Sequence, residues 1–315
     1  MSAEKQTIDI IVPCFNEQDC IVPFTEAIGE IIKKIDGYTW KIIFIDDGSS
    51  DNTLSEIKRV CDSYCLAEIK YISFARNFGK EAALYAGLQK SDADYAIVMD
   101  VDLQHPPALI TEMISTIENE DYDCVGARRV SRKGEPFIKS IFSRGFYYVI
   151  NWVTGMRLVP GMTDYRIMKR KVVQAIASMP ERERFIKGIY SWVGFKTKWI
   201  EYENVERTHG TSKWSIKGLW NYAKSGFIAF ATTPLRGVIY VGMLAVIAAV
   251  IYAIKLLGST LSGAREWQDT TTIILLLLFF GGVIITVLGI IGEYIARIYM
   301  EVKERPIYIT RDSNI

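Results

Sequence analysis

Two aspartates, Asp100 and Asp102, stand two positions apart after the apolar run YAIVM at residues 95–99. Side chains alternate along an extended chain, so both carboxylates point to the same side. Two hard oxygen donors placed in this way suit Mg²⁺ or Mn²⁺, which neutralise a diphosphate. The alternative is that paired aspartates at the end of a strand only cap the next helix. The segment DVDLQHPP is therefore a candidate metal site for a phosphorylated ligand.

A second acidic segment, DDGSSDNT, follows the apolar run KIIFI at residues 41–45. An acid at the end of a parallel strand can accept hydrogen bonds from a ribose or from the edge of a base. Helix capping accounts for Ser50 or Asp51, but it does not account for Asp46 and Asp47, which precede the glycine. The segment is therefore a candidate nucleoside site.

A third segment, ERTHGTSK, carries two basic residues, Arg207 and Lys213, six positions apart. Hydroxyl side chains and a glycine lie between them, so the segment can form a flexible loop that closes over phosphate oxygens. The alternative is an ordinary basic turn at the surface. His209 is interpreted as a loop residue rather than as a catalytic base or a metal ligand.

The first 130 residues contain the elements that must position these groups. Runs rich in Ile and Val alternate with amphipathic segments, and the runs IDIIVPCF, WKIIFIDDG, IKYISFA, DYAIVMDVD and YDCVGAR are expected to be strands. Nearly continuous apolar strands separated by helices indicate a parallel sheet covered on both faces. Ligands of such sheets gather at the carboxyl ends of the strands, where both acidic segments stand.

Two uncharged apolar stretches lie near the C-terminus, at residues 237–254 and 270–292. Each is close to the ~20 residues that a helix needs to cross a bilayer, so both are expected to span it. The alternative is a pair of buried core helices. The lysines and arginines outside the two stretches, and the lack of a secretory signal in MSAEKQTIDI, place both termini in the cytoplasm.

Two further segments, at residues 135–158 and 213–230, are aromatic and basic but too often charged to span a bilayer. Such segments favour amphipathic helices at the membrane interface, with ordinary surface helices as the alternative. The C-terminal segment KERPIYITR, residues 303–311, can add a strand to a neighbouring molecule, which would form a homo-oligomer.

The overall charge excludes one class of partner. The 315 residues include 37 Lys and Arg against 36 Asp and Glu, for a formal net charge of +1. Nucleic-acid-binding proteins usually carry a clear basic excess, so no nucleic-acid partner is expected. The five cysteines form no CxxC motif or zinc-like cluster, which predicts reduced structural thiols.

Five motifs occur in order along the chain: IVPCFNE, IDDGSSDNT, ARNFGKEAAL, MDVDLQHPP and GMTDYRIM. Together they resemble the family-two inverting glycosyltransferases with the GT-A fold. The segments RFIKGIYSWVGF and ERTHGTSK, with the two apolar stretches, are similar to polyprenyl-phosphate glycosyltransferases such as dolichol-phosphate mannose synthase and the bacterial bactoprenol glucosyltransferases. The resemblance covers residues 6 to about 300.

This resemblance implies an α/β fold. It comprises a Rossmann-like GT-A catalytic domain with a mostly parallel sheet, interfacial amphipathic helices and two C-terminal transmembrane helices. The expected parts are a nucleotide-sugar-binding half at 1–134, an acceptor half at 135–230, two transmembrane helices at 231–300 and a cytoplasmic tail at 301–315. The expected location is the inner (plasma) membrane.

The resemblance also assigns roles to individual residues around the donor. Asp100, Asp102 and Gln104 correspond to the metal-binding strand end, with Asp102 as the most direct ligand. Four residues near the ends of the first two strands are expected to hold the nucleoside, with the last of them on the base or the ribose. They are Pro13, Phe15, Glu17 and Asp47.

Basic residues are expected to bind the anionic groups of both substrates. Arg128 corresponds to a position near the donor. Lys139 and Ser143 match the acceptor-phosphate positions, although the family often has Arg where this chain has Lys139, which loses bidentate geometry. Arg207 and Lys213 match residues that grip the phosphates of the donor or the acceptor.

Asp164, in the motif TDYR, lies where the family carries an acid near the donor sugar. The resemblance implies that it orients the sugar or serves as a base. The alternative is a structural ion pair between Asp164 and Arg166.

The predicted function is inverting transfer of a sugar to polyprenyl (undecaprenyl) phosphate, with UDP-glucose as the first choice of donor because the two-span form with WVGF resembles bacterial glucosyl carriers. The alternatives are a GDP-mannose-dependent enzyme, a processive polysaccharide synthase and a non-catalytic nucleotide-sugar sensor. The lack of a QxxRW segment argues against the synthase, and the intact DVD and ERTHGTSK segments argue against the sensor.

Overall fold

The computed structural model describes residues 5–131, 151, 158–182, 184–203 and 270–315, together with part of the segment 240–258. The chain divides into two compact units. Residues 1–229 and 306–315 form the first, here called the sheet unit, and residues 230–305 form the second, the helix unit. The last ten residues therefore belong to the sheet unit, although they follow the helix unit in sequence.

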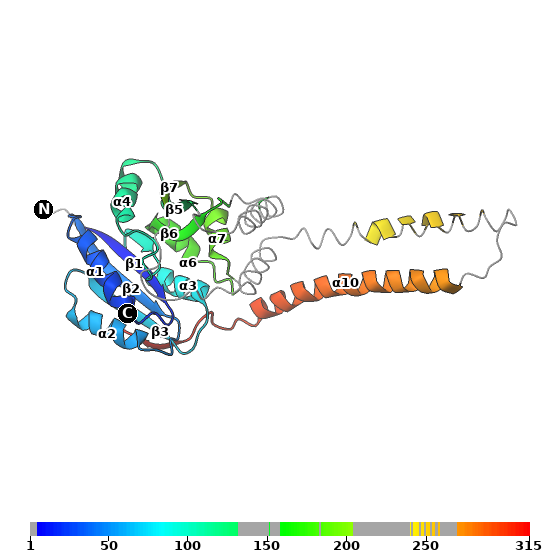
Figure 1. Cartoon of the computed structure of the whole chain (residues 1–315), viewed down its shortest axis with the longest axis horizontal. Helices are drawn as coiled ribbons and strands as arrows, with labels where there is room; N and C mark the ends of the chain where they lie inside the picture. The colour runs from blue at the N-terminus through cyan, green and yellow to red at the C-terminus, as the bar shows by residue number, and fades with distance from the viewer. Residues whose placement is uncertain are drawn as a thin grey trace. The chain divides into compact units, whose positions relative to one another are not determined.

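An eight-stranded sheet forms the core of the sheet unit (Figure 1). Its strands are β1 (Gln6–Cys14), β2 (Tyr38–Asp46), β3 (Glu68–Phe74), β4 (Tyr95–Val98), β5 (Cys124–Ser131), β6 (Met162–Lys169), β7 (Thr197–Glu203) and β8 (Thr310–Ser313). They lie in the order β7-β5-β6-β4-β1-β2-β3-β8. Strands β1 to β4 run parallel, as do β5 and β7, whereas β6 and β8 are antiparallel to their neighbours. The predicted mostly parallel sheet is confirmed.

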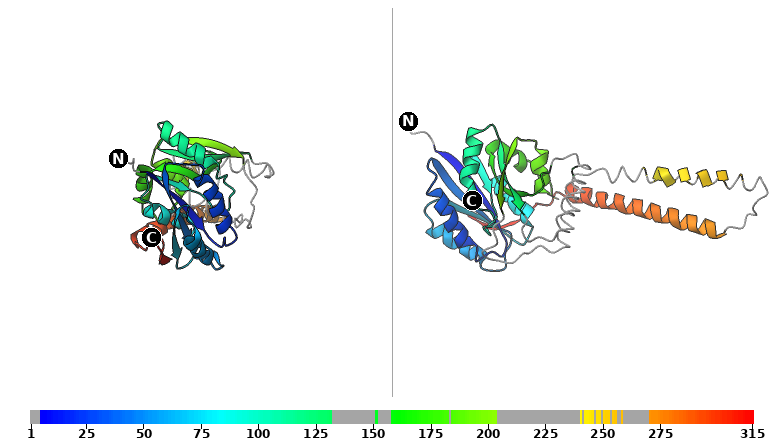
Figure 2. Two further views of the ribbon diagram at one scale, coloured as in Figure 1. Left: turned by 90° about the vertical axis from the view of Figure 1, so that its left-hand side faces the viewer. Right: turned by 45° about the horizontal axis from the view of Figure 1, so that its top comes forward.

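Helices cover both faces of this sheet (Figures 1 and 2). The described helices of the sheet unit are α1 (Ile21–Ile32), α2 (Thr53–Ser63), α3 (Lys80–Lys90), α4 (Leu109–Asn119), α6 (Arg170–Ala177) and α7 (Ile186–Trp192). Because side chains alternate along a strand, Ile8 and Ile10 join the core cluster that contains Phe24 of α1, whereas Ile11 faces α3. A Cβ on Gly87 of α3 would lie 2.3 Å from Cγ2 of Ile11, so glycine permits the close approach.

The carboxyl ends of four neighbouring strands meet at one edge of the sheet. Asp46 at the end of β2 pairs with Cys14 of β1 on one side and with Ser73 of β3 on the other. Next to β1, the N–H of Met99 donates to the carbonyl of Ile11 at 3.1 Å, directly after β4. Strand β6 runs in the opposite direction, so its first residues lie at this edge. Both acidic segments therefore converge with the start of β6.

The last strand of the chain, β8, pairs with the sheet of its own chain. The sequence predicted that these residues add a strand to a neighbouring molecule, but β8 is antiparallel to β3 of the same chain. Without β8, β3 would be an edge strand with unpaired backbone groups, which β8 covers.

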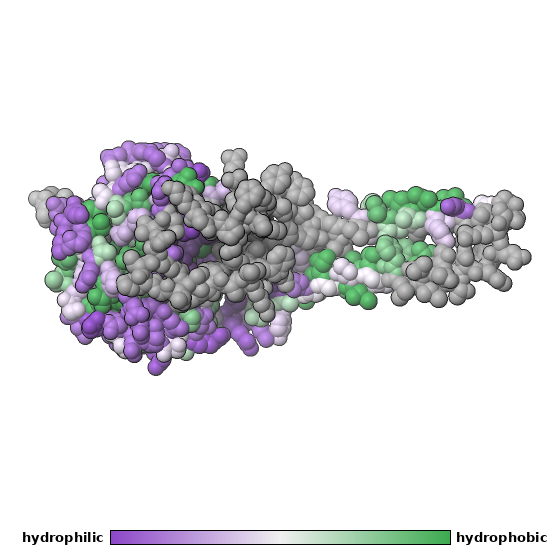
Figure 3. All heavy atoms as spheres, in the orientation of Figure 1, coloured by the Kyte–Doolittle hydropathy of each residue, from purple (hydrophilic) through white to green (hydrophobic). Residues whose placement is uncertain are grey.

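The helix unit contains a long apolar helix, α10 (Thr270–Val302), of 33 residues. At 1.5 Å per residue it extends about 50 Å, and its segment Phe279–Val302 is long and apolar enough to cross a bilayer. Its apolar side chains are exposed, with Ile285 at 72% and Leu277 at 68% (Figure 3). The predicted second span therefore continues ten residues past position 292, with Glu293 paired to Arg297 inside the helix.

Two transmembrane helices are not confirmed. Among the described residues, one helix passes as a membrane span, and the first predicted span, at 237–254, is described only in part. The interfacial helices predicted at 135–158 and 213–230 lie outside the described residues, apart from positions 151 and 158.

Candidate active site

Asp47 stands directly after β2 and holds the turn between β3 and α3. Its Oδ1 atom accepts the N–H of Phe78 at 2.7 Å, and its Oδ2 atom accepts the N–H of Gly79 at 2.9 Å. Gly48, with a φ of +68°, brings the two turns together: a Cβ there would lie 2.3 Å from the carbonyl carbon of Arg76. Burial raises the pKa of Asp47 to about 6, although the two amides act in the other direction.

The neighbouring acid, Asp46, has a structural role. Its side chain is buried and accepts the hydroxyl of Ser73 at 2.7 Å and the N–H of Ser49 at 3.0 Å. These bonds tie the end of β2 to β3 and close the DGSS turn. The two acids before the glycine therefore differ: Asp46 holds its own turn, and Asp47 holds the turn at the start of α3.

Three residues predicted to contact the nucleoside lie at the end of β1. Pro13 is the penultimate residue of the strand, and Phe15 directly follows it. The carboxylate of Glu17 accepts the S–H of Cys20 at 3.3 Å. The three residues share the carboxyl edge with Asp47 because β1 and β2 are neighbours in the sheet. Their contact with a nucleoside stays a prediction.

Lys80, the first residue of α3, joins two acids from different strands. Its ammonium lies 2.6 Å from Oδ1 of Asp100 and 2.9 Å from Oδ2 of Asp164. The acids meet because Val98 of β4 pairs with Arg166 of β6 in antiparallel register, so the next positions toward this edge also lie side by side. A lysine at the start of a helix thus reaches the ends of two adjacent strands.

The ammonium of Lys80 keeps both acids ionised. Burial by itself raises the pKa of Asp164, but Lys80 together with Lys187 outweighs burial and holds that pKa well below its usual range. Burial likewise opposes ionisation of Asp100, and Lys80 again outweighs it, so the pKa of Asp100 is lowered. Burial lowers the pKa of Lys80, yet the two carboxylates raise it above the usual lysine value.

The predicted metal-binding segment follows β4 as a tight turn. Oδ1 of Asp102 accepts the N–H of Gln104 at 3.2 Å, and Leu103 between them has a φ of +55°, a strained conformation of the kind found at functional sites. No group of three or more His, Cys, Asp or Glu side chains among the described residues forms a complete metal site. Magnesium sites often combine one or two carboxylates with substrate phosphates, and Asp100 and Asp102 fit that pattern.

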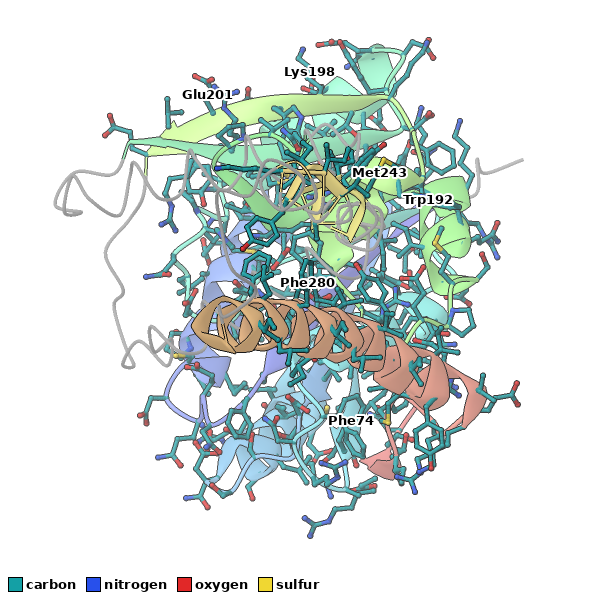
Figure 4. The ribbon with its side chains drawn as sticks, turned by 90° about the vertical axis from the view of Figure 1, so that its right-hand side faces the viewer. Phe74, Trp192, Lys198, Glu201, Met243 and Phe280 are labelled. Carbon is teal, nitrogen blue, oxygen red and sulfur yellow. The ribbon has the colours of Figure 1, made fainter. Side chains whose placement is uncertain are left out.

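Arg128 of β5 forms an ion pair with Glu201 of β7 at 2.7 Å. Glu201 is labelled on that strand in Figure 4. The expected position of Arg128 near the donor stays a prediction. Four other residues predicted to bind phosphate groups lie outside the described residues: Lys139, Ser143, Arg207 and Lys213.

Arg166 does not form the ion pair with Asp164 that the sequence offered as an alternative. Its buried guanidinium stacks over the ring of Tyr190 at 3.4 Å and donates to the carbonyl of Thr163 at 2.9 Å. Asp164 forms its ion pair with Lys80 instead. Lys80 of α3 therefore holds Asp164 beside Asp100, the acid predicted to bind metal.

Two residues of the site, Lys80 and Glu81, were not predicted to be functional. The carboxylate of Glu81 accepts the N–H of Ile186 at 2.8 Å, and burial, together with the charge of Asp164, raises its pKa to about 7. The motif ARNFGKEAAL could have indicated their role, because it places both residues at the start of a helix that follows a parallel strand, where ligands of such sheets bind.

Comparison with known proteins places this site in a family. Residues 9–176, more than half of the chain, match the family described as Glycosyl transferase family 2. The chain belongs to glycosyl transferase family 2. Residues 233–298 match the family described as GtrB C-terminal hairpin. The resemblance inferred from the five ordered motifs is confirmed, and with the mostly parallel sheet it supports the GT-A fold.

This family 2 glycosyltransferase is similar to other members over nearly its whole length. CsbB of Bacillus subtilis (strain 168) is 43% identical over 308 residues, which cover 98% of this chain and 92% of that protein. The SfII prophage-derived bactoprenol glucosyl transferase of Shigella flexneri is 38% identical, with 98% of each chain covered. Among solved structures, mannosyl-3-phosphoglycerate synthase from Rubrobacter xylanophilus aligns with a TM-score of 0.48 at 14% identity, over 85% of this chain and 80% of that chain.

Proposed function

We propose that this family 2 glycosyltransferase transfers glucose from UDP-glucose to polyprenyl (undecaprenyl) phosphate. Similarity to a bactoprenol glucosyl transferase over 98% of the chain supports both the sugar and the lipid acceptor. The observation that carries the proposal is the charge cluster at the carboxyl edge, where Lys80 bridges Asp100 and Asp164. Such a cluster can bind and orient a phosphorylated sugar.

The proposed metal ion is Mg²⁺ or Mn²⁺, held by Asp100, Asp102 and Gln104 at the end of β4. When bound, such an ion supplies positive charge to the diphosphate of the donor. Lys80 has a separate task in this proposal. Because its ammonium contacts Asp100 and Asp164 together, it sets the spacing between the metal-binding acid and the acid beside the sugar.

The other residues at the carboxyl edge of the sheet are proposed to bind different parts of the donor. Asp47, with Pro13, Phe15 and Glu17, is proposed to hold the nucleoside. Asp164 is proposed to accept hydrogen bonds from the sugar hydroxyls, since Lys80 keeps its carboxylate ionised.

The proposed reaction is an inverting displacement at the anomeric carbon. An oxygen of the acceptor phosphate attacks from the face opposite the diphosphate, the bond to UDP breaks, and UDP leaves with the electron pair. An α-linked donor therefore gives a β-linked product. The second pKa of a phosphate monoester is about 6, so the acceptor is already ionised at neutral pH and little is left for a general base to do.

Repulsion between two anionic substrates is the main obstacle to this reaction, and fixed positive charge lowers it. Within the described site the charge of Lys80 is offset by Asp100 and Asp164, so the proposed metal ion would supply this positive charge. Five further residues are proposed to contact the diphosphate or the acceptor phosphate: Arg128, Lys139, Ser143, Arg207 and Lys213.

The helix unit is proposed to anchor the enzyme at the cytoplasmic face of the plasma membrane, with both termini in the cytoplasm. Each CH₂ group of a polyprenyl chain that stays in the bilayer contributes ~0.8 kcal/mol, so the lipid phosphate remains at the membrane surface and the active site must reach it there. The exposed apolar surface of α10 and the match to the GtrB C-terminal hairpin support a multi-pass anchor.

The test uses the purified full-length protein in nanodiscs that contain undecaprenyl phosphate. Radiolabelled UDP-glucose and GDP-mannose are supplied separately, with and without Mn²⁺, and the lipid fraction is extracted. We expect label from UDP-glucose in a lipid product that requires the divalent ion and disappears in the variant Asp100→Ala/Asp102→Ala. Label from GDP-mannose alone would contradict the proposed donor, and long polymer or donor binding without transfer would contradict the proposed reaction.

A further inference from the structure

The last ten residues, 306–315, form a segment here called the tail, which lies along β3 and is anchored at its far end. Asp312 pairs with Lys58 of α2 at 2.6 Å and accepts the hydroxyl of Tyr71 at 3.2 Å. The side chain of Asn314 accepts the N–H of Tyr71 at 2.6 Å. These contacts hold β8 in register on the edge of the sheet.

The near end of the tail contacts the end of β3, the residue that follows it and α3. The ring of Tyr308 stacks on that of Phe74, the last residue of β3, with centroids 4.7 Å apart; Phe74 is labelled in Figure 4. The hydroxyl of Tyr308 donates to the side chain of Gln89 in α3 at 3.2 Å. The carbonyl of Ile309 accepts the N–H of Ala75 at 2.9 Å. The tail therefore holds the start of the segment that joins β3 to α3, at Ala75, and also contacts the far end of α3, at Gln89.

That segment, residues 75–79, is here called the donor loop because Asp47 binds it. Phe74, under the ring of Tyr308, packs edge-on against Phe78 with centroids 5.8 Å apart. The N–H of Phe78 is in turn held by Asp47. Residues 75–77 of the loop are exposed. The tail holds the start of the loop at Ala75, and the Asp47 carboxylate holds its end at Phe78 and Gly79.

We propose that the tail is a positioning element for donor binding, and that Tyr308 fixes the donor loop against Asp47. The proposal rests on the proposed function, in which Asp47 holds the nucleoside. The tail reaches the donor loop through Phe74, which packs on Phe78, and through the hydrogen bond from Ala75 to Ile309. On its other side the loop lies against the turn at Gly48, where the backbone of Arg76 leaves no room for a Cβ. Loss of the tail contacts frees the donor loop, and a mobile donor loop must be ordered again when the donor binds, which weakens binding.

Sequence connectivity gives this arrangement a further consequence. Only three residues, 303–305, separate the end of α10 from the start of the tail. The segment that leaves the proposed membrane anchor is thus the one that supports the nucleoside end of the site. A catalytic fragment that ends before the tail is expected to bind its donor poorly even when it folds.

The experiment compares Tyr308→Ala with two matched controls in the full-length protein. Tyr308→Phe keeps the ring stack on Phe74 and loses the hydrogen bond to Gln89, and Lys58→Ala weakens the far anchor without touching the donor loop. Binding of UDP with Mn²⁺ is measured by calorimetry, the KM values for donor and acceptor are measured separately, and amide hydrogen exchange is followed at residues 75–79.

We expect Tyr308→Ala to weaken UDP binding and to raise the donor KM by about 3- to 10-fold, the effect of losing one aromatic stack. The acceptor KM should stay unchanged, and exchange at Phe78 and Gly79 should become faster. Both controls should stay within about 2-fold of the wild type. Unchanged UDP affinity together with unchanged exchange at the donor loop would overturn the proposal.

A second variant and a second measurement cover the cases in which Tyr308→Ala does not fold or UDP does not bind. If Tyr308→Ala does not fold, Tyr308→Leu retains apolar bulk without the ring face and is expected to give the same pattern. If the wild-type protein binds no UDP, the proposed donor fails, and hydrogen exchange at residues 75–79 still decides whether the tail fixes the loop.

Discussion

Asp47 and Asp164 lie at the same edge of one sheet, yet their charges are balanced in opposite ways. Asp47 accepts two backbone N–H groups, and its pKa rises to about 6 because burial outweighs them. Asp164 contacts the ammonium of Lys80, and its pKa falls well below the usual range although it is buried too. Lys80 and Lys187 together lower the pKa of Asp164, whereas two amides do not lower that of Asp47, because a full charge interacts more strongly with a carboxylate than a peptide dipole does.

This difference matches the two ends of the proposed donor. A nucleoside is uncharged, so a carboxylate that accepts hydrogen bonds is sufficient near Asp47. The sugar diphosphate is anionic, so the acids at the other end would hold it through the proposed metal ion, with Lys80 fixing the positions of Asp100 and Asp164.

Lys80→Met tests the charged end and should have the largest effect. Two partly buried carboxylates would lose their shared cation, so we expect kcat/KM to fall by at least about 100-fold. Because the lysine side chain is partly exposed, the expected loss of stability is moderate, about 1–3 kcal/mol, seen as a Tm lowered by about 2–10 °C. Steady-state kinetics and thermal unfolding measure the two effects.

The control for this variant lies at the other end of the same helix. Lys90→Met removes an exposed lysine of α3 and should leave both quantities unchanged. Equal effects of the two substitutions would contradict the special role of Lys80.

Asp164→Asn keeps the size of the side chain and removes its charge. We expect kcat to fall by about 10- to 100-fold, because the sugar loses a charged acceptor and Lys80 loses a partner. The donor KM should change by less than about 3-fold, since the nucleoside end is untouched. Unchanged turnover would remove Asp164 from the residues that act on the sugar.

Asp47→Asn tests the uncharged end through pH. Asp47 ionises near pH 3.8 when exposed and near pH 6 in the folded chain, so the wild-type protein loses stability as the pH rises between these values. The loss amounts to roughly 2–3 kcal/mol at neutral pH. The variant lacks this loss, so its Tm relative to the wild type should increase from pH 5 to pH 7.5. A difference in Tm that is the same at both pH values would contradict the raised pKa.

Lys196→Ala should have the smallest effect on turnover and Tm, because it removes an exposed ion pair. Both Lys196 and its partner, Asp121, are exposed, so water already screens the pair. Neither turnover nor Tm should change measurably. A clear loss in either quantity would show that carboxylate pairs matter here regardless of position.

The acidic segments could be located from the sequence because they depend on local order. Apolar runs followed by acids predict strand ends, and β2 and β4 end beside Asp47 and Asp100 as expected. Lys80 could not be assigned in the same way. Its partners are 20 and 84 positions away, and they meet only because β6 inserts antiparallel between β4 and β5.

The tail shows the same limit. The segment KERPIYITR was expected to add a strand to another molecule, whereas the observed strand begins only at Thr310, near the end of that segment, and pairs with β3 of the same chain. Strand tendency is a local property, whereas the free edge that a strand covers depends on which strand the whole sheet leaves at its border.

The amino-acid order by itself determined the kinds of element and their sequence: alternating apolar runs make a covered parallel sheet, carboxylates follow its strands, and a long apolar helix lies near the C-terminus. Only the tertiary structure decided which charges and rings meet: Lys80 between two acids, Arg166 on Tyr190 and Tyr308 on Phe74. The reason is physical. Backbone periodicity acts over a few residues, whereas ion pairs and ring contacts act over a few ångströms between residues that the topology brings together.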